Sequence, residues 1–177
     1  APGCELRSQI GRGGGLERCV MRPRAESDKG SSIVVIRGMI AADVPAVLSI
    51  LQESPEASLW SENGILESII HGMAWVSEQD RRVAGFLIGR VVADEFEILN
   101  MGVAVAYRRR GIASRLVREA LERARMAGAR NAHLEVRASN EAAIRLYRRH
   151  GFQQYGQRLQ YYQYPREDAL LLSVEMW

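Results

Sequence analysis

The most constraining feature of the sequence is a basic, glycine-containing turn between an apolar run and a helical stretch. The apolar run covers residues 98–105, and the helical stretch covers residues 114–127. The turn between them reads Arg108-Arg109-Arg110-Gly111-Ile112-Ala113. A helix start has unpaired backbone N–H groups and partial positive charge, so a strand entering a helix through this turn predicts an anion-binding site. The alternative is an ordinary solvated helix start, and the residues that follow are needed to decide.

Length and composition predict one folded domain with an N-terminal extension. The chain has 177 residues, of which 47% are hydrophobic and 25% charged, as in ordinary globular proteins. Residues 1–32 are rich in Gly, Ser and charge without apolar periodicity, so we expect a disordered extension before a domain at 33–177. Both cysteines, Cys4 and Cys19, fall in that extension, which favours a cytoplasmic location. No apolar run approaches the roughly 20 residues of a membrane helix, so we expect no membrane partner.

The formal charge of +3 conceals two halves of opposite sign. Residues 40–107 contain three basic and ten acidic residues, whereas residues 108–177 contain fourteen basic and seven acidic residues. The second half suits a polyanionic ligand, and the first half suits a basic partner.

The periodicity of apolar residues predicts a mixed α/β domain. Strands are expected at 33–37, 73–77, 83–92, 96–105, 131–136, 152–161 and 169–176. Helices are expected after an N-cap at Asp43, from Ser61 or Asn63, over 114–127, and from Ser139 or Asn140 to His150. Short turns predict an antiparallel meander over 73–105, and the strand–helix–strand unit over 96–136 is expected to be parallel.

Three residues after the basic turn can carry chemistry, and each also has a purely structural interpretation. Glu135 shares a strand face with His133 and Arg137, either exposed to water or at the end of a central strand where it could act as a general base. Tyr147 faces the core side of its helix, either as a packing residue or as a proton donor. Asn140 is either an N-cap or a ligand contact.

The sequence lacks the motifs of several other kinds of functional site. His71, His133 and His150 have no metal-ligand spacing, so no metal is expected. The sequence has neither a serine nucleophile elbow nor a Walker-type phosphate loop. The arginines of the 114–127 helix are balanced by glutamates, and the stacking aromatics of an RNA platform are missing, so no direct nucleic-acid partner is expected.

With these elements in order, residues 33–177 resemble the GNAT acetyltransferases. The signature Arg/Gln-x-x-Gly-x-Gly/Ala is met by Arg108, Gly111 and Ala113. The similarity is greater to the RimI type, which acetylates the N-terminal alanine of a small-subunit ribosomal protein. It is carried by Leu59-Trp-Ser-Glu62, by the run from Leu134-Glu-Val-Arg-Ala-Ser-Asn to Leu146-Tyr147, by Gly151-Phe152, by Tyr161-Tyr162 and by Arg166-Glu-Asp-Ala169.

The resemblance implies a GNAT fold, a mixed, mostly antiparallel sheet of six to seven strands with four helices, and acetyl-CoA as the acyl donor. It implies Glu135 as general base and Tyr147 as general acid, with no metal. Trp60, Tyr161 and Tyr162 would line the peptide entrance. The implied cofactor-binding residues are the backbone of Met101, Gly102 and Val103, the turn residues Arg108, Arg109, Arg110, Gly111, Ile112, Ala113 and Ser114, and Asn140. Gly102 stands where the family more often has a small side chain.

The expected partner is therefore a protein or peptide N-terminus, such as that of a ribosomal protein, and the expected state is a monomer or a weak dimer. Two alternatives stay open: a GNAT enzyme that acetylates lysine or a small-molecule amine, and a non-catalytic acetyl-CoA-binding module.

Overall fold

The computed structural model describes residues 33–54, 56 and 60–176. The expected disorder of residues 1–32 lies outside this range and stays a prediction. Along the chain the elements are β1 (Val34–Gly38), a 3-10 helix (Ala41–Asp43), α1 (Val44–Gln52), α2 (Glu62–Ile70), β2 (Ala74–Gln79), β3 (Arg82–Val92), β4 (Glu95–Val103), a second 3-10 helix (Val105–Tyr107), α3 (Ile112–Met126), β5 (Asn131–Arg137), α4 (Glu141–Arg149), β6 (Gln153–Gln163) and β7 (Arg166–Glu175). The seven strands and four α-helices confirm the predicted fold class.

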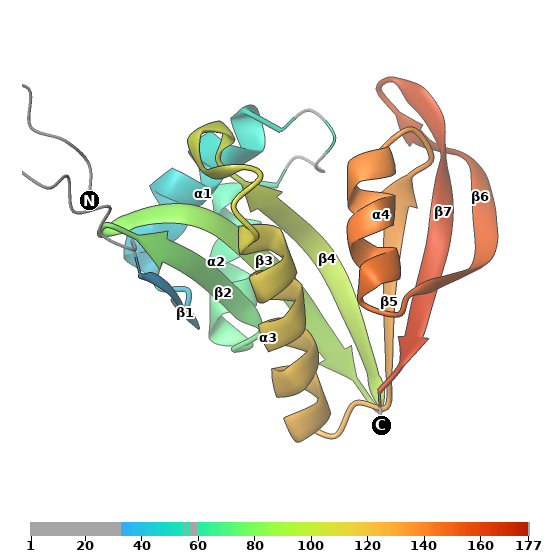
Figure 1. Ribbon diagram of the computed structural model, residues 1–177, viewed down its shortest axis with the longest axis horizontal. Coiled ribbons are helices and arrows are strands. Elements are labelled where there is room, and N and C mark those ends of the chain that lie inside the picture. Colours follow the sequence, from blue (N-terminus) through green and yellow to red (C-terminus); the bar gives the residue numbers. More distant parts are fainter. Residues whose placement is uncertain (1–32, 55, 57–59, 177) are drawn as a thin grey trace, which may run out of the picture. The chain divides into compact units, whose positions relative to one another are not determined.

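All seven strands form one sheet with the order β1-β2-β3-β4-β5-β7-β6 (Figure 1). The β2-β3-β4 meander is antiparallel, as predicted, and β4 pairs with β5 in parallel across the α3 connection. The remaining pairs are antiparallel. The sheet therefore has a single parallel contact among its described strands, at its centre.

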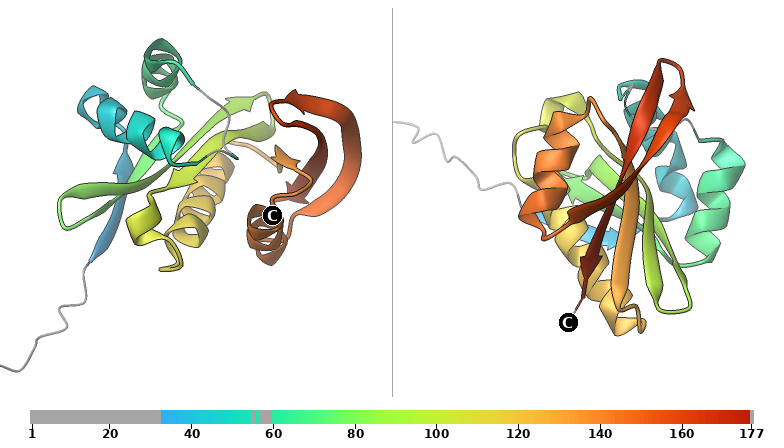
Figure 2. Two further views of the ribbon diagram at one scale, coloured as in Figure 1. Left: turned by 90° about the horizontal axis from the view of Figure 1, so that it is seen from above. Right: turned by 90° about the vertical axis from the view of Figure 1, so that its right-hand side faces the viewer.

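The helices cover the sheet on both faces, with α1 and α2 on one side and α3 and α4 on the other (Figure 2). The α3 face is buried through Leu116, Ala120 and Ala124, which recur every four residues and so form one stripe. On the opposite face, Val47 of α1 and Ile65 of α2 belong to a second apolar cluster with Phe86 of β3. Among the described residues, none of the helices has the length and apolar character needed to cross a membrane.

The two central strands separate part of the way along their length. Pairing of β4 with β5 runs from Glu95 opposite Asn131 to Ile98 opposite Leu134. Leu99 is then an extra residue in β4, because Ile98 and Asn100 face the adjacent β3 residues Gly89 and Ile88. A bulge of this kind bends its strand and increases the local twist. Beyond it the two strands diverge, as Figure 1 shows.

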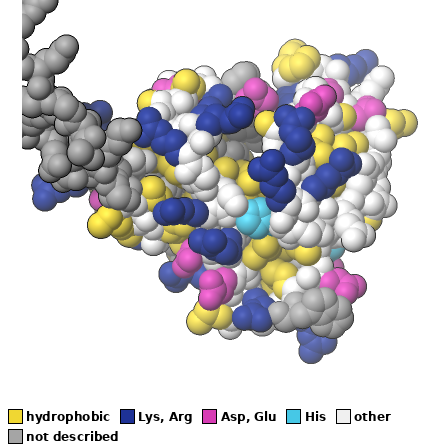
Figure 3. Space-filling view, viewed as in Figure 1, with side chains coloured by type: hydrophobic (Ala, Val, Ile, Leu, Met, Phe, Trp, Pro, Cys, Tyr) yellow, Lys and Arg dark blue, Asp and Glu magenta, His cyan; other side chains and the backbone are white. Residues whose placement is uncertain are grey.

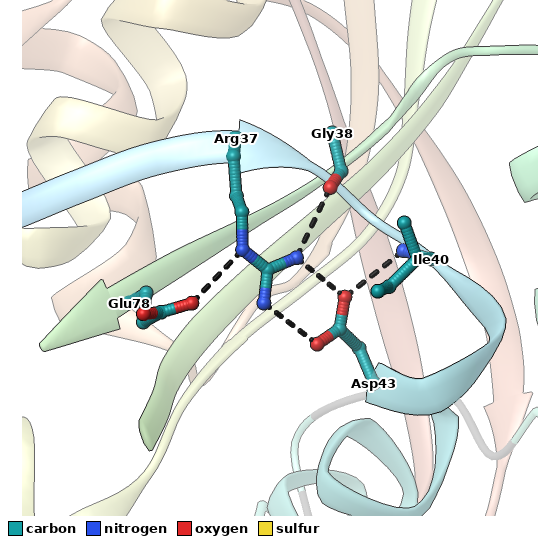
Figure 4. A network of polar contacts seen from close by, with 5 residues as sticks. All are labelled: Arg37, Gly38, Ile40, Asp43 and Glu78. Carbon is teal, nitrogen blue, oxygen red and sulfur yellow. Dashed lines mark hydrogen bonds and ion pairs between the residues drawn. The ribbon is translucent and has the colours of Figure 1, made fainter. Parts of the chain in front are cut away.

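Asp43 does not cap α1 in the manner that the sequence suggested. It occupies the N-cap position, but its side chain makes no cap hydrogen bond to α1. The carboxylate instead accepts from both terminal nitrogens of Arg37, at 2.7 and 2.9 Å, and from the Ile40 backbone N–H at 2.9 Å (Figure 4). Arg37 also donates to Glu78 at 2.9 Å. Asp43 therefore joins β1 to the start of α1 through an arginine six positions earlier, and it does not act as a helix cap.

Candidate active site

A cleft of about 260 Å³ opens where β4 and β5 separate. It is lined by backbone and side chains from both strands, from α4 and β6, and from the chain after α1. Its lining includes the predicted residues Met101, Gly102, Val103, Arg108, Glu135, Asn140, Tyr147 and Tyr162. The structure thus gathers into one cleft residues that span more than sixty positions of the sequence.

A second groove, of about 500 Å³, adjoins the cleft at the start of α3. The two share Met101, Val103 and Arg108 on one side and Ala142 and Ala143 of α4 on the other. The groove is also lined by the turn residues Arg109, Gly111, Ile112, Ala113 and Ser114. Arg110 does not line it; its guanidinium lies over the Tyr107 ring, 5.4 Å from the centroid.

The start of α3 has the features of an anion-binding helix terminus. No side chain caps the first turn of α3, so its N–H groups have no capping acceptor. Gly111 has a φ of 79°, which other residues rarely adopt, and no heavy atom lies within 4 Å of the position of an added Cβ. Arginine side chains gather on the face that carries α3 and α4 (Figure 3), and Arg109, Arg145 and Arg149 border the groove itself. This turn can therefore receive a phosphate group from outside the chain.

The part of β4 beyond Ile98 offers backbone groups to the cleft. The Ala104 N–H donates to the Ala84 carbonyl of β3 at 3.0 Å. Because backbone groups alternate in direction along a strand, those of Val103 and Met101 point away from β3, and those of Gly102 point toward it. An extended ligand can therefore pair with the backbone of Met101 and with the N–H of Val103, whose carbonyl accepts from Arg108 Nε at 3.0 Å.

Gly102 is required by packing. A Cβ there would lie 2.7 Å from Phe86 and 2.9 Å from Ile50 of α1. The glycine that departs from the family pattern thus allows α1 and β3 to pack closely against β4.

Glu135 faces the cleft and is held from β6. Its carboxylate forms an ion pair with Arg158, and its side chain is 22% exposed. It also forms a hydrogen bond with Tyr161, which is the main cause that raises the pKa of Tyr161. The Glu135 carboxylate therefore lies at the edge of the cleft, partly buried and already paired.

Tyr147 and Tyr162 are phenols with raised pKa values. Burial is the main cause for Tyr147, which is 6% exposed, and the nearby Tyr162 adds to it. Burial also raises the pKa of Tyr162 to about 12. The Tyr147 ring packs edge-on against Phe152 at 5.5 Å. Tyr147 packs in the core, as its first interpretation expected, and it also lines the cleft. Its role as a proton donor stays a prediction.

Asn140 is an N-cap, and its predicted contact with a ligand stays a prediction. Its Oδ1 accepts from the Ala143 N–H at 3.0 Å and caps α4, and the residue lines the cleft. Ser114 is also engaged within the chain, since its Oγ lies 2.9 Å from His150 Nε2.

The three residues expected at the peptide entrance lie in different places. Tyr162 lines the cleft, and Tyr161 lies beside it, in edge contact with the Tyr162 ring at 5.2 Å. Trp60 lines a separate pocket with Gly64 of α2 and Leu99 of β4. The structure therefore brings the two tyrosines to the site and leaves Trp60 outside the cleft lining.

Arg137 and Arg158 are site residues that sequence reasoning missed. Arg137 is 9% exposed, lies 4.0 Å above the Tyr162 ring, and donates to the Tyr164 and Pro165 carbonyls at the β6–β7 turn. An arginine on the same strand face as Glu135 was the available signal for Arg137. The sequence offered no such signal for Arg158, because its partner Glu135 lies 23 positions earlier in the chain.

No group of three or more His, Cys, Asp or Glu side chains with metal-binding geometry occurs among the described residues.

The comparisons with known proteins agree with this geometry. The sequence profile of the Acetyltransferase (GNAT) family matches residues 45–152. The [Ribosomal protein bS18]-alanine N-acetyltransferase of Escherichia coli K12 is 33% identical over 144 residues, which cover 78% of this chain and 95% of that protein. A putative enzyme of the same name from Bacillus subtilis is 32% identical over 142 residues, covering 78% and 93%.

The crystal structure of the ribosomal-protein-S18-alanine N-acetyltransferase from Escherichia coli superposes with a TM-score of 0.72 at 31% identity, covering 81% of this chain and 94% of that one. The chain belongs to the GNAT family of acetyltransferases and is an acyltransferase of the RimI type.

Proposed function

We propose that the protein transfers the acetyl group of acetyl-CoA to the α-amino group of a protein N-terminus, with the terminal alanine of a ribosomal protein as the first acceptor to test. The observation that carries the proposal is the continuity of the site. The uncapped start of α3, the exposed backbone of β4 and the side chains of Glu135 and Tyr147 line two adjoining hollows. The names and coverage of the relatives support the choice of acceptor.

The residues present fit acetyl-CoA. The N–H groups from Gly111 to Ser114 would hold the pyrophosphate with the helix dipole. Met101 and Val103 would pair with the pantetheine arm through their backbone groups, and Asn140 would contact it from the start of α4. Arg109 and Arg110 would add charge near the phosphates. The bound thioester supplies the activated acetyl group.

Glu135 is proposed as the general base. An α-amino group has a pKa of about 7.7–8.0, so much of it arrives protonated at neutral pH and cannot attack a carbonyl. A carboxylate at the edge of the cleft can accept that proton, directly or through a water. A backbone N–H of Met101 or Val103 would polarise the carbonyl under attack.

Tyr147 is proposed as the general acid. A phenol is protonated at neutral pH, and Tyr147 lines the cleft, so its hydroxyl can supply the proton that the leaving sulfur requires. Tyr161 and Tyr162 would contact the acceptor chain beside Glu135.

The test uses acetyl-CoA with a peptide library that varies the first residue and contains internal lysines, read by mass spectrometry. Label on the N-terminal residue is the expected result. Label confined to lysine, or to a small-molecule amine added to the library, would show that the protein is an acetyltransferase with a different acceptor. Binding of acetyl-CoA without any transfer would indicate a non-catalytic module. The cytoplasmic location and a monomeric or weakly dimeric state stay predictions.

A further inference from the structure

Arg108 uses its guanidinium within the chain. Its Nε donates to the Val103 carbonyl at 3.0 Å. Its Nη2 donates to the Glu53 carbonyl at 3.2 Å and to Ser54 Oγ at 3.0 Å. One side chain therefore joins the end of β4 to the residues that follow α1, more than fifty positions earlier in the chain.

A second contact parallels this bridge. The Glu53 carboxylate accepts from the Val105 backbone N–H at 3.1 Å. Arg108 and the Val105 N–H are thus the donors that tie the end of β4 to residues 53–54, which supply the acceptors. Ser54 is 7% exposed, so its hydroxyl is held in a largely buried position.

The bridge lies between the two hollows of the site. Ser54 and Glu56 line the cleft that holds Glu135 and Tyr162, and neither lines the groove at the start of α3. Arg108 borders both. Arg108 therefore fixes a part of the cleft lining that, like Glu135 and Tyr162, is not shared with the groove at α3, and this is the part where the acceptor would lie.

We propose that Arg108 is a positioning residue for the acceptor and not a phosphate ligand. It holds the Glu53–Ser54 wall at a fixed distance from the β4 edge that would carry the acyl donor. This inference rests on the proposed function, because it assigns the Ser54–Glu56 part of the cleft to an amine acceptor and the β4 edge to the acyl donor. A forked guanidinium suits the role, since Nε and Nη2 reach acceptors on two different segments.

The principal test separates acceptor binding from donor binding in two variants. Arg108→Ala removes the fork, and Arg108→Lys keeps the charge without the fork. Both variants are expected to raise the acceptor KM about tenfold, because a hydrogen bond to a charged group typically contributes that much. The acetyl-CoA Kd, measured by calorimetry, should stay within about twofold of the wild-type value. Arg115→Ala, an exposed arginine of α3 outside both hollows, is the charge-matched control and should leave both constants unchanged.

The opposite pattern would overturn the inference. A phosphate ligand predicts that Arg108→Ala weakens acetyl-CoA binding and that Arg108→Lys largely retains it. A double-mutant cycle with Ser54→Ala adds a check on the bridge: the effects of Ser54→Ala and Arg108→Ala on the acceptor KM should be less than additive. Fully additive effects would mean that Arg108 acts elsewhere.

Hydrogen exchange gives a readout that needs no turnover. In Arg108→Ala the amide of Val105 should exchange faster without any substrate, because the Glu53–Val105 contact loses its neighbouring support. Unchanged exchange at Val105 would contradict the bridge. If the wild type acetylates no amine, the proposed function fails, while calorimetry and exchange still decide the role of Arg108.

Discussion

The Glu135 carboxylate of β5 is held by the guanidinium of Arg158 from β6, on the side of the sheet where an acceptor amine would enter. Arg158 is 54% exposed and also lies 5.4 Å from the centroid of the Tyr161 ring. A protonated amine and a guanidinium are both cations that a carboxylate attracts. In the free protein, Arg158 therefore occupies a place on Glu135 that the acceptor would need.

Replacing Arg158 should consequently favour the acceptor. We expect Arg158→Gln to lower the acceptor KM about two- to fivefold, since exposed ion pairs contribute at most about 1 kcal/mol. Initial rates against peptide concentration at saturating acetyl-CoA measure this. A rise in KM instead would mean that Arg158 orients Glu135 for its role. Arg90→Gln, which removes an exposed ion pair with Glu97 on β4, is the matched control.

Replacing Glu135 should remove the proposed base. Glu135→Gln keeps the size of the side chain and is expected to lower kcat/KM by about 10²–10⁴-fold. The loss should be largest below about pH 8, where the amine is mostly protonated. Glu97→Gln on β4 is the control for the loss of one carboxylate. An unchanged pH–rate profile in Glu135→Gln would assign the base to another group.

Removing only the hydroxyl of Tyr147 tests the proposed acid. Tyr147→Phe retains the ring that packs on Phe152, so the fold should persist while kcat falls about 100-fold. Single-turnover rates of the variant and the wild type measure this loss, and a thermal melt verifies that the variant is folded. Tyr155→Phe, an exposed residue on β6, should retain wild-type turnover. Wild-type turnover in Tyr147→Phe would leave Tyr147 as a core residue only.

Gly102 should not tolerate a side chain. Because a Cβ would approach Phe86 and Ile50 to 2.7 and 2.9 Å, Gly102→Ala is expected to lower the free energy of unfolding by about 1–3 kcal/mol. Chemical denaturation measures this. Gly38→Ala, where no heavy atom lies within 4 Å of the added Cβ, should have a much smaller effect. Equal effects of the two substitutions would show that α1 yields to the new methyl group.

The Arg37–Asp43 pair should make stability depend on pH. Burial by itself would raise the pKa of Asp43, but the hydrogen bonds from Arg37 and from the Ile40 N–H outweigh it and lower the pKa below 3.8. A lowered folded-state pKa stabilises the protein at pH values above the unfolded pKa, and that stabilisation is lost as the pH falls through the folded value.

Asp43→Asn is therefore expected to lower the free energy of unfolding by about 1–3 kcal/mol at pH 7 and by much less near pH 2. Denaturation of both proteins at the two pH values measures the difference. Glu78→Gln, which removes the more exposed partner of Arg37, should cost less at pH 7. A difference that does not change with pH would mean that Asp43 acts through shape alone.

The order of the elements and the glycine-containing turn before α3 could be predicted from the sequence. Apolar periodicity and turn residues are local properties, so they predicted β4, the turn at Gly111, α3 and the Asn140 cap. The spacing of Leu134, Glu135 and Val136 also placed Glu135 on the face opposite the core, because side chains alternate along a strand.

The contacts of these residues depend on the tertiary structure. The pairs Glu135–Arg158 and Arg108–Ser54 join segments that lie 23 and 54 positions apart in the sequence and meet only in the folded chain. The position of Trp60 in a pocket separate from the cleft could not be predicted from the sequence either. The need for glycine at position 102 likewise became clear only from its close packing against Phe86 and Ile50. Long-range contacts depend on how the whole sheet twists and separates, and no local pattern encodes that geometry.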